Sequence, residues 1–390
     1  MSTRPWPQPN LPLRALTPAL LSLAAASLSA QLAPDHPPEY EIWAIDQGTH
    51  VVHIFDEALK ETDRIDLGAH GVRVPHMIEF TPDQRYGFIA SPGSGDVAVV
   101  RAIDRQVVAI LPTGPRTHHA AVAPDGRSVV VSVIGAADTP WDGKLVEITV
   151  DSDQARFEIG RQLVLAEDPL FATRADEFLE TGGAVCLAFT SDGRHGYVTL
   201  GPGLDEGGVV VLDTETFGLV EVFPPGEVAA NCGTILSPDG EHMYLVGGDG
   251  ETGVWHAVDT RTRRPVHHGG SHGHDAHGSA FTPDGGEYWL LNRVTSNAAV
   301  IDPATMEVIA EIPFVGKTPD IIAFSPEGRY AFITLRGPNP VTMPHVAVGE
   351  TPGFSVFDVR TRELVQLVEP ARGDPRSDFH AIAVGQLEHW

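Results

Sequence analysis

The sequence repeats a short pattern in which an apolar run ends in a turn of the Pro-Asp-Gly type. A pattern that recurs along a chain restricts the fold strongly, because every copy must form the same small unit of structure. The copies are centred on the turn positions Pro82, Pro124, Ser191, Pro238, Pro283 and Pro326. A further copy without the turn lies near the C-terminus, over residues 381–384. The chain is therefore a repeat protein.

Each repeat contains four predicted strands. In the first complete unit an inner strand before Pro82 is followed by strands at residues 86–90, 96–100 and 106–110, which are rich in β-branched residues and alternate in polarity. Equivalent positions are mostly 42 to 47 residues apart, the length of a four-stranded propeller blade. Two longer intervals indicate insertions, at about residues 136–183 and 336–352. Within the first insertion, residues 169–180 predict a short helix.

The two ends of the repeat region complete each other. Residues 41–46, 50–56 and 63–67 supply three strands without an inner one, and residues 378–385 supply an inner strand without the outer three. Joining the two pieces makes a seventh blade and leaves no open sheet edge. The predicted fold is all-β: a seven-bladed β-propeller of four-stranded blades over residues 40–390, closed by the C-terminal inner strand joining the N-terminal blade.

The N-terminus has the pattern of a secretory signal. Arg4 and Arg14 precede a mostly apolar run over residues 15–30, and the small residues Ser27 and Ser29 favour cleavage near residue 30. This run is too weak for a stable membrane span. We therefore predict a signal peptide at residues 1–30, a polar, Pro-rich leader at residues 31–39, and a periplasmic or secreted protein with no membrane span after cleavage.

Charge and cysteine content exclude several classes of function. The formal net charge of −26 argues against a nucleic acid partner, because phosphate binding needs Lys and Arg patches. Cys186 and Cys232 are too few for a disulfide scaffold, although one bridge between them stays open. The sequence contains no Gly-rich phosphate loop before a helix and no nucleophile elbow.

One position of the repeat collects side chains that bind metals. This register position lies six residues before the turn position, and it is occupied in chain order by His76, His118, Val185, Cys232, His277, Asp320 and, in the turnless copy, His380. Equivalent positions of the blades converge on the axial channel, so these side chains are expected to be neighbours. Imidazole binds copper, zinc, iron and nickel, and a thiolate or carboxylate can complete the ligand set. The alternative is that the histidines cap inner strands by hydrogen bonding to carbonyl groups.

Other histidines and cysteines lie near the register position. His272 and His274 precede His277 and can extend the site as ligands, as supporting groups or around a second ion. His119 is one residue out of register, so we expect it to pack between blades. Cys232 is in register and is either a ligand or a small buried hydrophobic residue. Cys186 is out of register and is expected in the core.

Three cations precede register residues: Arg73, Arg116 and Lys317. In so acidic a protein, cations gathered at one rim indicate a binding site for an anion. The alternative is that they pair with rim carboxylates such as Asp374 or Asp378.

The chain resembles a known family of repeats. Residues 285–313 look like the YVTN-type repeat of secreted bacterial propellers, and Tyr197-Val198-Thr199-Leu200 comes close to the signature itself. The resemblance covers nearly all of residues 40–385. That group is classed with the propeller of nitrous oxide reductase, and copper enzymes of the wider group bind metal through histidines on inner strands. The resemblance therefore implies a propeller fold and makes copper the first candidate metal.

Two classes of function remain. The favoured hypothesis is an exported propeller that binds a transition metal, copper first, at the channel mouth, and acts as a redox enzyme on a small, anionic molecule. The competing hypothesis is a non-catalytic propeller that binds an envelope protein, using Trp141, Phe171 and Phe178 of the first insertion, which would equally suit a lid. A third possibility is a haem- or quinone-handling propeller. The absence of a Cys-x-x-Cys-His sequence excludes covalent c-type haem in this chain.

Overall fold

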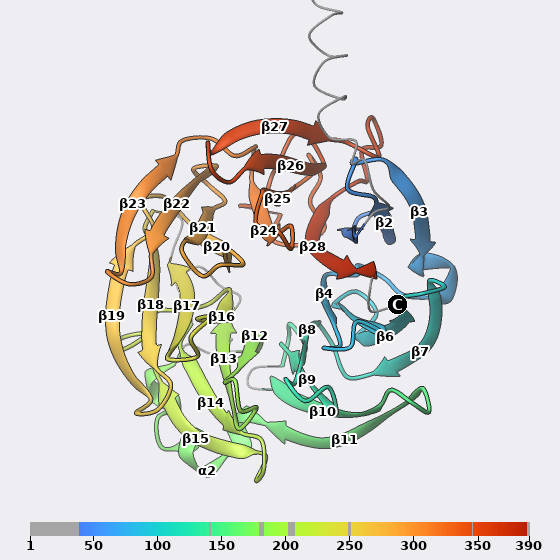
Figure 1. Ribbon diagram of the computed structural model, residues 1–390. Helices are drawn as coiled ribbons and strands as arrows, with labels where there is room; N and C mark the ends of the chain where they lie inside the picture. Colours follow the sequence, from blue (N-terminus) through green and yellow to red (C-terminus); the bar gives the residue numbers. More distant parts are fainter. Residues whose placement is uncertain are drawn as a thin grey trace, which may run out of the picture.

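Seven four-stranded antiparallel sheets surround a central axis in the computed structural model, which describes residues 39–139, 142–178, 183–201, 207–248, 251–344 and 346–387 (Figure 1). The predicted seven-bladed propeller is confirmed. The predicted signal peptide and the leader up to residue 38 lie outside the described residues. Within the described part of the chain, no helix is long and apolar enough to cross a membrane.

The first six blades follow one another along the chain, each running from its inner to its outer strand. Blades 1 to 3 contain β4 (Met77–Phe80), β5 (Tyr86–Ser91), β6 (Asp96–Arg101), β7 (Gln106–Pro112); β8 (Thr117–Val122), β9 (Ser128–Val133), β10 (Lys144–Asp151), β11 (Arg156–Val164); and β12 (Gly183–Phe189), β13 (His195–Gly201), β14 (Val209–Asp213), β15 (Gly218–Phe223). Blades 4 to 6 contain β16 (Thr234–Leu236), β17 (His242–Gly248), β18 (Gly253–Asp259), β19 (Arg264–Gly270); β20 (Ala276–Phe281), β21 (Tyr288–Asn292), β22 (Asn297–Asp302), β23 (Glu307–Ile312); and β24 (Pro319–Phe324), β25 (Tyr330–Leu335), β26 (Gly353–Asp358), β27 (Glu363–Val368).

Blade 7 joins the two ends of the chain. Its inner strand is β28 (Phe379–Gln386), and the other three are β1 (Tyr40–Asp46), β2 (Val51–Phe55) and β3 (Glu61–Asp66). The β1–β28 pairing runs from Tyr40 opposite Gln386 to Asp46 opposite Phe379. The C-terminal strand therefore closes the ring as predicted, and the edge of β1 is covered.

Backbone conformation and packing both explain why the Pro-Asp-Gly turn recurs in the repeat. Gly126, in the blade 2 turn, has φ +67°, a left-handed conformation that glycine adopts at little cost. A Cβ atom at Gly126 would lie 3.1 Å from the ring of Pro82 in the blade 1 turn. The equivalent glycines of blades 3, 5 and 6 face the turn proline of the preceding repeat in the same way. The motif therefore recurs because each turn packs on the turn before it.

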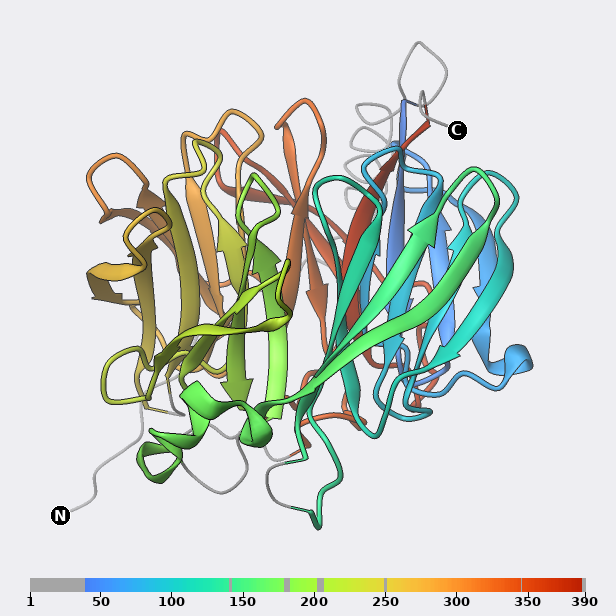
Figure 2. The same cartoon turned by 90° about the horizontal axis from the view of Figure 1, so that it is seen from below.

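The stretch predicted as the first insertion, residues 136–183, also contains the third and fourth strands of blade 2, β10 and β11; the described residues after β11 form short helices rather than one longer helix. Asp168 caps α2 (Pro169–Ala172) by accepting hydrogen bonds from Leu170 N and Phe171 N, and 3-10 turns η2 (Leu165–Glu167) and η3 (Ala175–Glu177) flank it. The predicted helix over residues 169–180 is therefore too long. Phe171 and Phe178 pack in a buried cluster between blades 2 and 3. The short helices, drawn in green, lie toward the lower edge of the propeller in Figure 2. Both phenylalanines are core residues rather than an exposed contact surface, and Trp141 lies outside the described residues.

Candidate metal centre in the axial cavity

The inner strands carry β-bulges at the register position. In blade 2, Thr117 pairs with Val133 and His119 pairs with Ser132, so His118 is the extra residue. The same irregularity includes the register residue in blades 3, 5, 6 and 7. A bulge bends a strand and redirects its side chain. The fold thus turns these side chains away from the space between blades and toward the axis.

Threonines on second strands satisfy the backbone at two of these bulges. Thr199 Oγ1 accepts a hydrogen bond from Cys186 N at 3.2 Å and donates to the carbonyl oxygen of Cys232 at 2.6 Å. Thr334 does the same with Ile321 N and the carbonyl oxygen of His380. Each threonine therefore links the bulge of its own blade to the register residue of the next blade.

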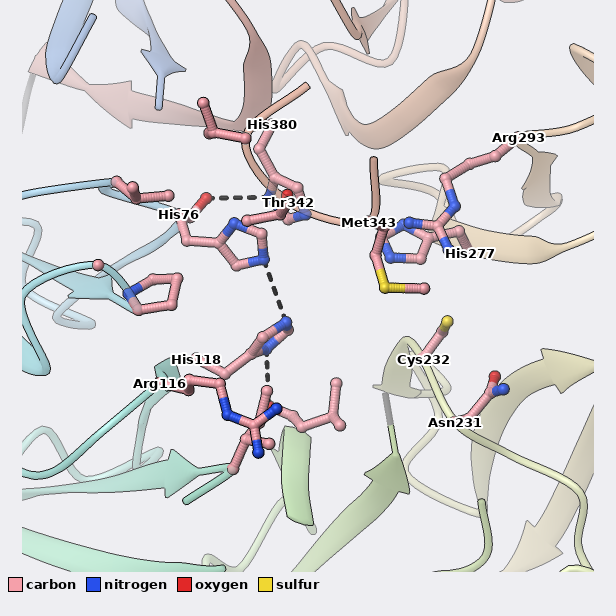
Figure 3. A pocket seen from close by; sticks show the side chains of 16 residues that line it. His76, Arg116, His118, Asn231, Cys232, His277, Arg293, Thr342, Met343 and His380 are labelled. Carbon is pink, nitrogen blue, oxygen red and sulfur yellow. Dashed lines mark hydrogen bonds between the residues drawn. The ribbon is translucent and has the colours of Figure 1, made fainter. Parts of the chain in front are cut away.

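The register side chains meet at a cavity of about 330 Å³ on the axis (Figure 3). It is lined by Val74, His76, Pro92, Gly93, Arg116, His118, Ile134, Val185, Asn231, Cys232, His277, Arg293, Val341, Thr342, Met343 and His380. Six of the seven register residues line it, and the seventh, Asp320, lies fully buried beside His277. The repeat alignment therefore identified residues that are neighbours in space.

Each of the four register histidines holds a proton on Nδ1. Nδ1 of His76 lies 2.8 Å from Gln47 Oε1, and Gln47 is oriented by its amide nitrogen, which donates to Asp378 Oδ2 at 2.9 Å. Nδ1 of His118 lies 3.0 Å from the carbonyl oxygen of Val185. Both neighbours accept hydrogen bonds, so Nδ1 must be the donor in each ring.

The other two histidines also donate a hydrogen bond from Nδ1. His277 Nδ1 lies 2.9 Å from the carboxylate and 3.1 Å from the carbonyl oxygen of Asp320. His380 Nδ1 lies 3.0 Å from the carbonyl oxygen of His76. The expected alternative was that the histidines cap inner strands by hydrogen bonding to carbonyl groups, and in these rings only Nδ1 makes such a bond. Nε2 of His380 lies 3.6 Å from Asp320 Oδ2, and all four histidines line the cavity.

The Nε2 atoms of His76 and His118 face each other at 3.1 Å. With Nδ1 protonated in both rings, two neutral imidazoles would direct lone pairs at each other. The rings of His76 and His380 also stack, with centroids 3.5 Å apart. This crowding of electron pairs favours a cation or a shared proton in the cavity.

Three of the histidines are held neutral. Burial, followed by the nearby His380 and His118, lowers the pKa of His76 well below its usual range. Burial, with His119 and His277, lowers the pKa of His118 to about 3. Burial likewise lowers the pKa of His380. Neutral imidazole is the form that binds a metal ion.

His277 differs from the other three because it forms an ion pair. Burial and the charge of Arg293 oppose its protonation, but Cys232 and the Asp320 carboxylate outweigh them and raise the pKa of His277 to about 10. Burial raises the pKa of Asp320, but His380, Arg336 and His277 together lower it well below its usual range. His277, Asp320 and His380 offer potential ligand atoms that all lie within 4.8 Å of one another.

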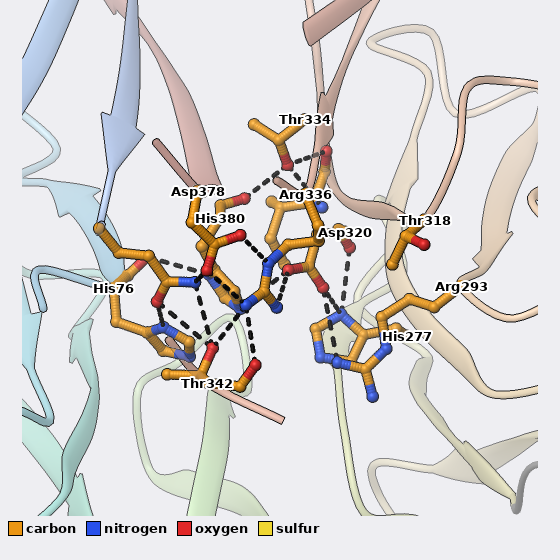
Figure 4. A network of polar contacts seen from close by, with 12 residues as sticks. His76, His277, Arg293, Thr318, Asp320, Thr334, Arg336, Thr342, Asp378 and His380 are labelled. Carbon is orange, nitrogen blue, oxygen red and sulfur yellow. Dashed lines mark hydrogen bonds and ion pairs between the residues drawn. The ribbon is translucent and has the colours of Figure 1, made fainter. Parts of the chain in front are cut away.

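A buried ionic network supports the cavity from one side (Figure 4). Arg336 is fully buried; its Nη1 is 2.8 Å from Asp320 Oδ2, and its Nε and Nη2 are each 2.8 Å from the carboxylate of Asp378. Its Nη2 also donates to the carbonyl and hydroxyl oxygens of Thr342, both at 2.9 Å. Arg336 therefore holds the second insertion, which contains Thr342 and Met343, over the axis.

The cations expected at the rim lie in different places. Arg116 lines the cavity, and its Nε donates to the carbonyl oxygen of Gly135. Arg73 is exposed and donates to the carbonyl oxygens of Gly68 and Val72, both at 2.8 Å. Lys317 is not among the described residues that line the cavity. Asp378 pairs with Arg336, rather than with a rim cation, and Asp374 pairs with Arg376.

Arg293 is a site residue that no sequence motif marks: it is almost fully buried yet lines the cavity. Its Nε and Nη2 bind the Asp275 carboxylate at 2.7 and 3.0 Å, and its Nη1 lies 3.6 Å from Asp320 Oδ1. Arg293 follows β21 rather than preceding an inner strand. A search confined to the register position could not find it.

His272 and His274 do not reach the cavity. His272 is exposed, and its Nδ1 lies 2.7 Å from Glu311 Oε1 on the outer strand β23. The backbone of His274 is held by Thr295 Oγ1 at 3.0 Å. The β19–β20 connection crosses a whole blade from its outer to its inner edge, a width of about 14 Å for strands spaced about 4.8 Å apart. Residues only a few positions before His277 are therefore still far from the axis.

The remaining candidates have structural environments. His119 is buried between blades, with Nε2 2.8 Å from Glu79 Oε1 and Nδ1 accepting from Leu187 N, as expected. Cys186 and Cys232 are both free thiols, which answers the open question of a bridge. Burial, with a smaller effect of Cys232, raises the pKa of Cys186, in keeping with a core residue.

Comparison with known proteins supports the fold and goes no further. No protein-family profile matches the chain, and no curated protein sequence gives a significant match. Among solved structures, dihydro-heme d1 dehydrogenase NirN in complex with DHE is similar with a TM-score of 0.57 and 17% identity, over 90% of this chain and 76% of that chain. Hydrazine synthase of Kuenenia stuttgartiensis is similar with a TM-score of 0.57 and 16% identity, over 83% of this chain and 91% of that chain. At these identities the similarity shows that the chain shares the β-propeller fold.

Proposed function

We propose that this protein is an exported propeller that binds a transition metal ion in the axial cavity, with copper as the first candidate. The candidate ligands are the imidazoles of His76, His118, His277 and His380, which line the cavity. The YVTN-type resemblance favours copper, and imidazole ligands also suit zinc, iron and nickel.

The observation that carries the proposal is the shared orientation of the four rings. In each, Nδ1–H donates to an oxygen atom, and all four side chains line the cavity. Metal-binding histidines almost always donate their other N–H to a carbonyl or carboxylate in this way. Two nitrogen ligands about 2.1 Å from one ion lie roughly 3.0 Å apart at a right angle and roughly 3.4 Å apart at a tetrahedral angle. The 3.1 Å separation of His76 and His118 falls within that range.

The chain's own groups would then have distinct roles. His76, His118 and His380 are already neutral, whereas His277 must lose a proton when it becomes a ligand. We assign Asp320 an orienting role, because its two carboxylate oxygens face His277 and Arg336. Bound copper would supply one-electron redox chemistry.

The substrate we propose is a small anionic molecule. Arg116 and Arg293 both line the cavity beside the histidines, and they are the cations best placed to attract it. Arg73 and Lys317, expected in the same role, are better assigned to the outer rim. A volume of about 330 Å³ lies at the lower end of the range for small-molecule sites.

Metal analysis of untagged protein tests the proposal. Protein purified from the periplasm, or reconstituted with copper and freed of excess metal, should contain a stoichiometric amount of transition metal by mass spectrometry. Each single change His76→Ala, His118→Ala, His277→Ala or His380→Ala should weaken binding by about tenfold or more, as the loss of a supporting group already does.

His195→Ala is the matched control, since His195 begins the second strand β13 away from the cavity lining and should leave binding intact. Stoichiometric metal that survives the double change His118→Ala with His277→Ala would exclude this site. Protein that stays metal-free after copper loading would instead favour the non-catalytic interaction module.

A further inference from the structure

Two sulfur atoms lie in the same cavity as the four histidines. Cys232 and Met343 both line it, and Figure 3 shows both side chains pointing into its open centre, on the side of His277. Cys232 comes from the register position of blade 4. Met343 comes from the second insertion, which belongs to blade 6. Chain segments far apart in sequence therefore bring sulfur to one point.

The second insertion is held firmly where it crosses the axis. Val341 N donates to Asp378 Oδ2 at 2.8 Å, and Thr342 accepts from the buried Arg336. The carbonyl oxygen of Met343 accepts from Val346 N and Ala347 N at 3.1 and 2.9 Å. Bonds on both sides of Met343 thus hold its backbone over the axis.

We propose that Cys232 and Met343 provide sulfur ligands that make the site selective for monovalent copper. This inference rests on the proposed function, because it assumes a metal held by the histidines. Thiolate and thioether are soft ligands that select Cu(I), whereas carboxylate and water suit harder ions. Zinc takes thiolate and imidazole readily, but its usual ligands do not include the methionine thioether.

Cu(I) and Zn(II) binding to matched variants test the proposal. Cys232→Ser and Met343→Leu keep the approximate size of each side chain. Met306→Leu is a control, since Met306 lies in the turn before β23 and is not among the described residues that line the cavity. Cu(I) affinity is measured without oxygen by competition with a chromogenic Cu(I) chelator, and Zn(II) affinity by a Zn(II) chelator. Cys232→Ser and Met343→Leu should each weaken Cu(I) binding by at least about tenfold. Met343→Leu should change Zn(II) binding by less than about threefold, and Met306→Leu should change neither.

X-ray absorption of the Cu(I)-loaded wild-type protein is a second test that does not require a variant to fold. It should show sulfur scatterers together with imidazole. A spectrum with nitrogen ligands alone, or wild-type Cu(I) affinity in both sulfur variants, would overturn the sulfur assignment and leave the histidine site standing. Loss of all metal binding in the wild-type protein would refute both.

Discussion

Replacing Arg336 by methionine should destabilise the propeller strongly. The guanidinium of Arg336 contacts Asp320 and Asp378 at 2.8 Å, and all three residues are fully buried. Methionine fills much of the same volume but provides no hydrogen-bond donor. The change would therefore leave two buried carboxylates without their main countercharge.

The magnitude follows from what each carboxylate keeps. Asp378 still accepts from Gln47, Gly337 and Val341, and Asp320 still pairs with His277. Removing one partner of a buried ion pair costs about 3–5 kcal/mol. The unfolding entropy of roughly 350 ordered residues is about 0.7 kcal/mol/K, so the expected fall in Tm is about 4–7 °C.

Urea denaturation of metal-free protein at pH 7, supported by a thermal scan, measures this change. Arg101→Met is the matched control, because Arg101 pairs with Asp104 at 2.6 Å on the exposed surface. That variant should lose less than about 1 kcal/mol. An Arg336→Met protein as stable as the wild type would show that the buried network contributes no net stability and would refute the reasoning.

Three further predictions concern acid, chain closure and export. Burial, with repulsion from His268 and His267, lowers the pKa of His256 to about 4. Below about pH 6.5 the unfolded chain therefore binds a proton at His256 that the folded protein does not bind. The free energy of unfolding should be unaffected by His256 above this pH and should fall by about 3 kcal/mol by pH 4. His256→Gln should remove that part of the acid loss in urea denaturation, and an unchanged pH profile would argue against it. Deleting residues 378–390 removes β28 and exposes the edge of β1, so the protein should aggregate or fail to accumulate; a monomeric truncated protein with unchanged Tm would contradict the closure. Mature protein should begin between about residues 27 and 32 by N-terminal sequencing, and full-length protein embedded in the membrane would show an anchor instead.

The fold was predictable because each repeat contains the residues that its own strands and turn require. The turn glycines pack on preceding turn prolines, as Gly126 does on Pro82, so the same few residues must recur in each blade. The register position followed from the same alignment, and it led to His380, which has no turn after it. Strand ends differ by only a few residues from the expected ones, because frayed ends depend on neighbouring blades.

The rest of the site could not be predicted from the register position alone. Arg293 and Arg336 each directly follow the second strand of their blade, β21 and β25, and Met343 belongs to the insertion after β25. Their side chains reach the axis through long-range contacts, such as that of Arg336 with Asp378. The opposite holds for His272, which was a candidate because it is close to His277 in sequence: the width of a whole blade separates it from the cavity. Sequence distance measures spatial distance poorly wherever a connection spans the radius of the ring.

The closing strand also determines when the cavity can exist. Gln47 and His380 lie at opposite ends of the chain, yet both contact His76. A ribosome-bound or partly translocated chain that lacks its last strand cannot assemble the ligand set, however well its early blades fold. Metal could thus be acquired only after the whole polypeptide has been made and the ring has closed. Completion of the ring would serve as the checkpoint for metal loading.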